Sequence, residues 1–285
     1  MTSTARDLAG KIDAFFERGR ELWWDSRWTL RRRTLRACGS EIPLLLSPWR
    51  AARRPGGGTP PPAAPDVGER VIEKEALWKG NGIVLTPNRY PAWKDHLLLW
   101  ERRPLREPGP AFLELLLRLC REREDLFAFV NSIGAAATVS RAHAQVVRLG
   151  ESPPVAGTPV HTRPSGSEEI AFPPGEGPWP AFFARLAGDP PAVARTLARL
   201  IRLRLCPAFN LAFSRDKAWI FFRRRESVPS GYPLPLGALE LSGLFLFEEE
   251  ASFLAMTPGG IESSLREASF PPGPPPEEAL LAALA

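Results

Sequence analysis

The chain has 285 residues, 44% of them hydrophobic and 24% charged, so it can bury the core of one large domain or of two fused halves. Its formal net charge of +5 is modest and favours anionic ligands over cationic ones. The sequence has no run of about eighteen apolar residues, and its N-terminal segment contains acidic residues and lacks the apolar stretch of a secretory signal. We therefore expect a cytoplasmic protein without a membrane partner.

Residues 1–54 are expected to form a helical segment that packs on the main domain. Apolar side chains recur there at helical spacing: Leu8, Ile12, Phe15 and Phe16. A basic run from Arg27 to Arg36 is interleaved with Trp28, Leu30 and Leu35 at roughly helical spacing. We interpret the run as the solvated face of a helix and expect no nucleic-acid partner.

Residues 55–66 are rich in proline and glycine and are predicted to be a flexible loop, because proline removes backbone donors and glycine maximises chain entropy. The glycines are followed by a threonine and prolines instead of a GK[ST] sequence. A phosphate-binding P-loop is therefore not expected here.

The main domain, 67–270, is expected to have two halves. In the first half, about 67–150, the pattern predicts strands over 82–88 and 96–100, a helix over 110–125, and strands over 126–131 and 140–149 around an alanine-rich turn. In the second half, about 168–257, it predicts helices near 179–186 and over 191–205, followed by strands over 209–213, 218–222 and 239–247.

Two proline-rich segments flank the second half. Residues 151–168 are interpreted as an excursion in which His161 is an exposed loop residue, and residues 271–285 as a tail with a short C-terminal helix.

The segment from Asn131 to Gln145, NSIGAAATVSRAHAQ, has the composition of a phosphate site. If its end is a strand, alternation places Arg141, His143 and Gln145 on one face. Neutral imidazole is a competent nucleophile toward phosphorus. The P–N bond it forms is labile enough for the phosphoryl group to be transferred to a second acceptor. The alternative from chemistry alone is that His143 is a packed core residue.

The small residues of this segment suit a phosphate. Gly134 and the alanines let a phosphate approach the main-chain N–H groups, and the hydroxyls of Thr138 and Ser140 are further donors.

The segment resembles the motif of the histidine-triad superfamily in its transferase and phosphorylase branch. The pattern of the GDP-L-galactose phosphorylases, approximately NSLGxxATxxHxHxQ, aligns here without a gap. Three more blocks resemble the family in the expected order: 81–100, which contains His96, then 208–226 and 238–247. Together the four blocks cover roughly 80 to 250, which is more specific than a lone motif.

The resemblance implies an α+β fold, with a histidine-triad antiparallel sheet, flanking helices and a pseudo-duplicated architecture. It implies that His143 is the nucleophile of a nucleotidyltransferase or phosphorylase, usually oriented by the backbone carbonyl two residues earlier. Gln145 would bind the transferred phosphoryl group. Asn131 and Asn210 are further candidates for substrate binding, although Asn210 could equally cap a strand, and His96 is interpreted as structural.

Arg141 departs from the family pattern, because the first motif histidine stands at this position. In galactose-1-phosphate uridylyltransferase relatives that histidine binds zinc together with a CxxC pair, and here Cys38 is followed by Glu41. With two ligands missing, and with Cys38, Cys120 and Cys206 far apart, we expect no metal, no cofactor and no disulfide framework. Arg141 would either clamp a phosphate or mark a catalytically impaired nucleotide-binding protein.

The favoured function is transfer of a nucleotidyl group from a nucleoside diphosphate sugar or a dinucleoside polyphosphate, with phosphate or a sugar phosphate as acceptor. The alternatives are a regulatory nucleotide-binding protein and a nucleotide hydrolase. The oligomeric state is open between a monomer and a homodimer.

Overall fold

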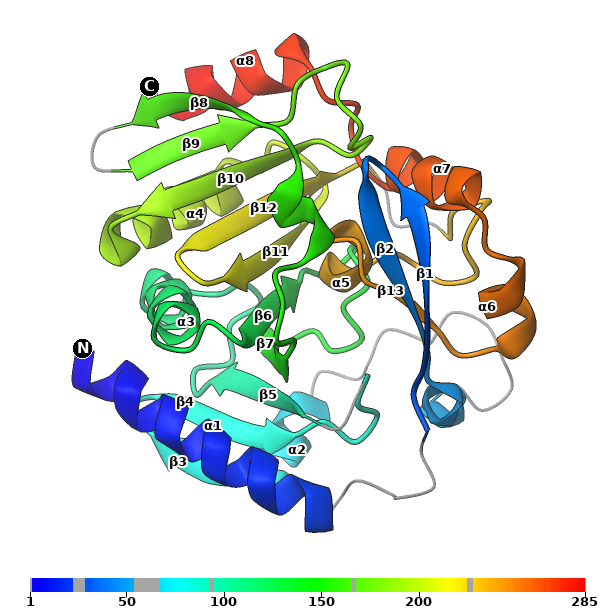
Figure 1. The fold of residues 1–285 in the computed structure, drawn as a ribbon. Helices are drawn as coiled ribbons and strands as arrows, with labels where there is room; N and C mark the ends of the chain where they lie inside the picture. The colour runs from blue at the N-terminus through cyan, green and yellow to red at the C-terminus, as the bar shows by residue number, and fades with distance from the viewer. Residues whose placement is uncertain are drawn as a thin grey trace.

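The computed structural model describes residues 2–22, 29–53, 67–92, 95–165, 168–224 and 228–284. A ten-stranded antiparallel sheet crosses the whole molecule in the order β3-β4-β5-β7-β6-β11-β12-β10-β9-β8, and a three-stranded sheet, β1-β2-β13, stands beside it (Figure 1). The predicted loop over 55–66 lies outside the described residues. No helix in the described ranges is both long and apolar enough to cross a bilayer.

The first half of the large sheet contains five strands and one crossover helix. Helix α3 (Pro110–Glu122) connects β5 to β6 and begins with a proline, as the sequence predicted. The strands are β3 (Trp78–Gly80), β4 (Ile83–Pro87), β5 (His96–Glu101), β6 (Leu126–Asn131) and β7 (His143–Arg148).

The second half repeats this arrangement. Helix α4 (Pro190–Leu203) connects β10 to β11, and the halves join where β6 pairs antiparallel with β11. The pseudo-duplication implied by the resemblance is therefore visible in the strand order. The strands are β8 (His161–Ser165), β9 (Glu168–Phe172), β10 (Phe183–Gly188), β11 (Ala208–Ser214) and β12 (Lys217–Arg223).

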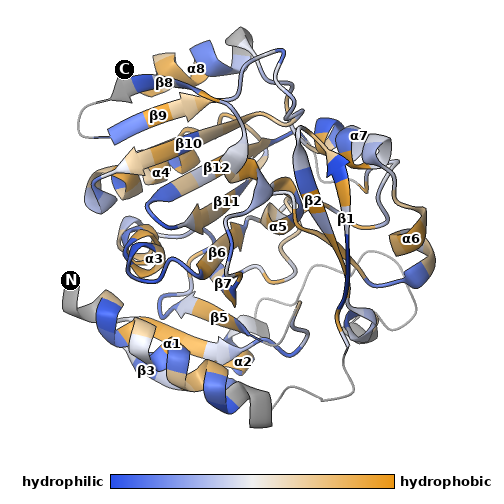
Figure 2. Ribbon diagram, viewed as in Figure 1, coloured by the Kyte–Doolittle hydropathy of each residue, from blue (hydrophilic) through white to orange (hydrophobic). Residues whose placement is uncertain are grey.

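One face of the sheet is covered by helices α1 (Thr2–Leu22), α3, α4 and α8 (Pro274–Leu284). Helix α1 presents Leu8, Ile12 and Phe16 to the core, and Figure 2 shows its alternating hydrophobic and hydrophilic bands. Inward-facing residues of both sheet halves, such as Leu99 and Leu211, complete this core.

The other face carries the small sheet and short helices, which cover mainly the second half. Here Trp219, Phe221 and Phe183 pack with the small sheet and with Trp179. The elements of this layer are β1 (Arg31–Ala37), β2 (Ser40–Leu46), η1 (Pro48–Arg53), α2 (Val67–Glu75), η2 (Pro154–Gly157), α5 (Ala238–Leu241), β13 (Phe245–Phe247), α6 (Glu250–Ala255) and α7 (Pro258–Ala268).

The helix expected over the basic run is wrong where the chain is described. Arg31–Ala37 is strand β1, antiparallel to β2, and alternate residues from Arg33 onward are the less exposed ones. Arg33 donates hydrogen bonds to the carbonyls of Phe253 and Met256. The segment therefore alternates as a strand and not as a helix. The carbonyls on α6 and in the turn after it provide acceptors for the Arg33 side chain.

Three further element predictions are corrected. The segment predicted as a helix near 179–186 enters strand β10, which is paired on both sides. The strand predicted over 239–247 is divided between α5 and β13 by a turn at Gly243, whose φ of +93° favours glycine. His161 lies on strand β8, where Nε2 is 2.7 Å from a carboxylate oxygen of Glu277 on α8.

Candidate active site

His143 is the first residue of β7, opposite Trp100 on β5. Its side chain is buried, and its ring stacks on the indole of Trp100 with centroids 4.6 Å apart. The indole is itself fixed, because its Nε1–H donates to Thr86 Oγ1 at 2.9 Å. The imidazole is thus held on a rigid aromatic platform, a role for Trp100 that the sequence pattern did not assign.

The proton of His143 is placed by the backbone. Nδ1 is 2.9 Å from the carbonyl oxygen of Arg141, and because a carbonyl only accepts, Nδ1 carries the hydrogen. Burial lowers the pKa of His143, while the hydrogen bond to Arg141 acts in the opposite direction. The ring therefore stays neutral with the lone pair on Nε2. The carbonyl two residues earlier, expected from the resemblance, is present.

Arg141 is not where strand alternation would place it, because β7 begins only at His143. Its guanidinium forms an ion pair with Glu69 on α2 and donates at 2.6 Å to the carbonyls of Glu101 and Arg102. With only 4% of the side chain exposed, Arg141 anchors α2 to the end of β5. The structure therefore gives it a structural role in place of the expected phosphate clamp.

Gln145 lies two residues after His143 on the same face of β7, and it is half-buried. Its Oε1 is 3.0 Å from Nε2 of His96, which is fully buried on β5. Burial, reinforced by the charge of Arg50, lowers the pKa of His96 to about 3, so this imidazole is neutral as well. His96 is thus a structural residue, as expected, and it contacts the site directly.

Asn131 and Asn210 join the two halves of the sheet. Oδ1 of Asn131 accepts from Asn210 Nδ2 and from the backbone N–H of Ala238, both at 2.8 Å. Asn210 Nδ2 also donates to the carbonyl of Ala135 in the turn before β7. Asn210 is completely buried, and these contacts hold the turn in place; its role in substrate binding stays a prediction.

The turn between β6 and β7 has the backbone that its small residues predicted. Gly134 has a φ of +82°, and a β-carbon there would lie 3.3 Å from that of Ala208. Thr138 is exposed and Ser140 is half-buried. The glycine is favoured by its positive φ and by the close approach to β11.

A separate cavity of about 240 Å³ opens on the helix-covered face of the sheet. Its lining includes Ser132, Arg204, Cys206 and Phe209, and it does not include His143 or Gln145. The candidate nucleophile therefore lies on the opposite face of the sheet from this cavity.

No metal-binding group is formed in the described ranges, where no three His, Cys, Asp or Glu side chains come together. Cys38 lies in the turn between β1 and β2, and all three cysteines are free thiols. Burial raises the pKa of Cys38 and Cys120 to about 12, so both are inert thiols at neutral pH.

The sequence matches neither a protein-family profile nor a curated protein. Among solved structures, the yeast Ap4A phosphorylase Apa2 in complex with Ap4A is similar, with a TM-score of 0.66 and 16% identity over 92% of this chain and 97% of that one. Apa2 in complex with AMP gives the same TM-score at 15% identity, over 92% and 96% of the two chains. The chain therefore shares the fold of this Ap4A phosphorylase over nearly its whole length.

Proposed function

We propose that the chain is a nucleotidyltransferase of the phosphorylase type, acting on a dinucleoside polyphosphate or a nucleoside diphosphate sugar. The observation that carries this proposal is the state of His143. Its Nδ1–H is tied to the Arg141 carbonyl, and its neutral ring leaves the Nε2 lone pair as the nucleophile.

In the first step, Nε2 attacks the α-phosphorus of the donor. A P–N bond forms, the bond to the bridging oxygen breaks, and the leaving phosphate group takes the electron pair. In the second step an oxygen of phosphate, or of a sugar phosphate, attacks the same phosphorus and the P–N bond breaks. Two displacements at one centre predict ping-pong kinetics and retained stereochemistry.

Further residues are candidates to assist this chemistry. Gln145 lies on the face of His143 and would hydrogen-bond the transferred phosphoryl group. Thr138, Ser140 and the main chain of the turn at Gly134 would donate to oxygens on which charge develops. Replacement of the first motif histidine by Arg141 leaves the orienting carbonyl in place, which favours retained catalysis over the impaired binding protein.

The test is intact-protein mass spectrometry after incubation with Ap4A and a panel of nucleoside diphosphate sugars, under non-acidic conditions that preserve a phosphoramidate. We expect a mass increase of one nucleoside monophosphate in the wild type and none in His143→Ala. Addition of phosphate should discharge the adduct and release a nucleoside diphosphate. If no donor forms an adduct although nucleotides bind, the chain is a binding protein; if the adduct is discharged by water alone, it is a hydrolase.

A further inference from the structure

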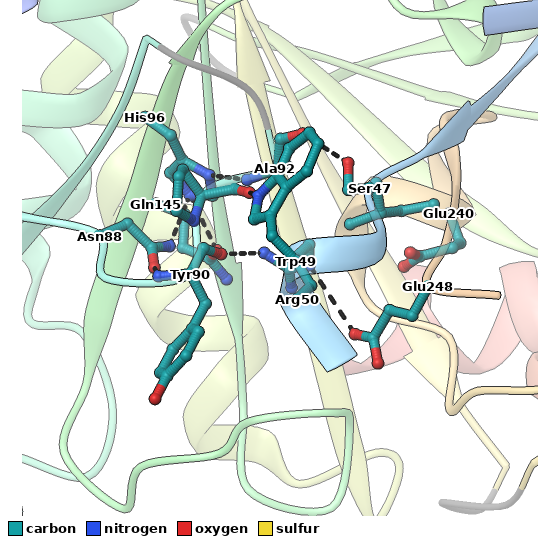
Figure 3. A network of polar contacts seen from close by, with 12 residues as sticks. Ser47, Trp49, Arg50, Asn88, Tyr90, Ala92, His96, Gln145, Glu240 and Glu248 are labelled. Atoms are coloured by element: carbon teal, nitrogen blue, oxygen red, sulfur yellow. Dashed lines mark hydrogen bonds and ion pairs between the residues drawn. The ribbon is translucent and has the colours of Figure 1, made fainter. Parts of the chain in front are cut away.

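Three consecutive backbone carbonyls in the loop before β5 are bound by one short segment of the N-terminal region. Ser47 Oγ donates to the carbonyl of Ala92 at 2.8 Å, and Trp49 Nε1 donates to that of Pro91 at 2.9 Å. Arg50, buried beside Glu248, donates to the carbonyl of Tyr90. Figure 3 shows these side chains reaching from the end of β2 and from η1 toward the loop. The loop over Tyr90–Ala92 is thereby held against the small sheet.

This loop determines the tautomer of His96. The backbone N–H of Ala92 donates to Nδ1 of His96 at 2.9 Å. A backbone N–H is always a donor, so Nδ1 must be the unprotonated nitrogen. Since a neutral imidazole carries one hydrogen, that hydrogen is on Nε2.

The hydrogen on Nε2 of His96 in turn fixes the amide of Gln145. Two side chains lie 3.0 Å from Nε2, Gln145 and Asn88. Oδ1 of Asn88 accepts from the backbone N–H of Tyr90 at 2.9 Å, which leaves the Asn88 amide nitrogen facing the ring. The acceptor for His96 is therefore Oε1 of Gln145, and the orientation of the Gln145 amide follows from this network.

We propose that His96, held by the segment Ser47–Arg50, is a positioning residue that locks the Gln145 amide with its two N–H donors directed away from β5, toward the reacting phosphoryl group. This inference rests on the proposed function and deepens it. A rotated amide would present its carbonyl oxygen to a negatively charged phosphoryl group, whereas the locked amide presents donors to oxygens that gain charge in the transition state. The small sheet would thus contribute to transfer without touching the substrate.

The lock is tested by a double-mutant cycle on the single-turnover rate of nucleotidyl-His143 formation. Gln145→Ala should lower the rate about 100-fold, as for loss of one preorganised donor. His96→Ala should lower it about tenfold with donor affinity nearly unchanged, because the released amide samples the wrong rotamer. In the Gln145→Ala background, His96→Ala should have almost no further effect on the rate. Full additivity of the two substitutions would overturn the inference.

Two conservative variants separate orientation from packing. Gln145→Glu keeps the shape and can still accept from His96, but it presents an oxygen to the phosphoryl group, so it should be slower than Gln145→Ala. His96→Gln keeps a donor near the position of Nε2 and should retain more activity than His96→Ala. Equal rates within either pair would contradict an oriented amide. Thermal unfolding of each variant checks that the fold is retained.

A second measurement does not depend on activity. The chain has only three histidines, so ¹⁵N-histidine labelling, with substitutions for assignment, gives the protonation of each ring nitrogen by NMR. We expect His96 protonated on Nε2 and unprotonated on Nδ1 at neutral pH. Protonation on Nδ1 would overturn the inference even in a fully active enzyme. Absence of the His143 adduct, with the expected His96 tautomer present, would refute the proposed function and leave the lock itself in place.

Discussion

The two halves of the large sheet have the same strand order but different chemistry on the face away from the helices. The start of β7 places His143 opposite Trp100 near the end of β5, whereas the start of β12 places Lys217 opposite Ala187 near the end of β10. The next residue on that face is Gln145 in one half and Trp219 in the other, paired with Phe129 and Ala212 respectively.

What covers each half explains the difference. Phe221, Trp219 and Phe183 are part of the core under the small sheet and the helices near it, so polar side chains there would lack solvent. The corresponding region of the first half is flanked by α2, which Arg141 anchors through Glu69. The layer over β12 therefore makes Trp219 part of the core, whereas Gln145 at the matching position of β7 is half-buried.

The largest effect is expected from replacing the imidazole of the first half by an apolar ring. His143→Phe keeps a flat ring on Trp100 but removes the lone pair of Nε2. Nucleotidyl transfer should fall about ten-thousand-fold or more, as for loss of a nucleophile, with little change in the free energy of unfolding. Measurement of turnover alongside urea unfolding checks both parts, and a variant that retains most of its activity would contradict the assignment.

An imidazole placed in the covered second half should affect stability instead. Phe221→His places an imidazole in a fully buried apolar cluster, and we expect a loss of about 2–4 kcal/mol in the free energy of unfolding. Activity per folded molecule should be unchanged, because Phe221 is not part of the site. An unchanged midpoint of urea unfolding would show that this half is less tightly covered than the structure indicates.

Arg141→Met tests whether the residue is an anchor. The variant keeps an apolar stem but leaves the carbonyls of Glu101 and Arg102 without their donor, which should lower the free energy of unfolding by about 1–3 kcal/mol. Binding of inorganic phosphate, measured by calorimetry, should change little. A large loss of phosphate affinity with normal stability would restore the role of a phosphate clamp.

The histidines also make stability depend on pH. His96 and His143 both have a lowered pKa in the folded protein, so the unfolded chain binds more protons once the pH falls below about 6.5. The contribution of His96 is complete above that pH and is lost as the pH falls toward about 3, at about 1.4 kcal/mol per pH unit. Urea unfolding from pH 7 to pH 4 should show the wild type losing stability faster than His96→Gln; parallel curves would contradict the shift.

Much of the first half could be predicted from sequence, because its elements carry one clear periodicity. The proline at the start of α3 and the short apolar runs of β5 and β6 define those elements locally. The pattern over 131–145 correctly indicated the fold, the turn at Gly134 and the carbonyl that contacts His143. These features depend on residues close together in the chain.

The incorrect predictions concern segments whose structure is decided by distant partners. Arg31–Ala37 fits a helix by spacing. It is a strand because it pairs with β2 and because Arg33 donates to a backbone carbonyl of α6. The direction of the Arg141 side chain depends on Glu69 and on the end of β5, which no local pattern reveals. The contacts of Ser47 and Trp49 with Ala92 and Pro91 likewise join segments more than forty residues apart.

The assignment of His143 as the nucleophile is tested most directly by locating the covalent intermediate. Wild-type protein would be quenched in alkali during turnover with Ap4A, digested and analysed by tandem mass spectrometry, with phosphorus NMR of the denatured protein to distinguish the two imidazole nitrogens. We expect one nucleotidyl group, on Nε2 of His143. A nucleotidyl group on another residue, on Nδ1, or on no residue while the donor is consumed would contradict this assignment.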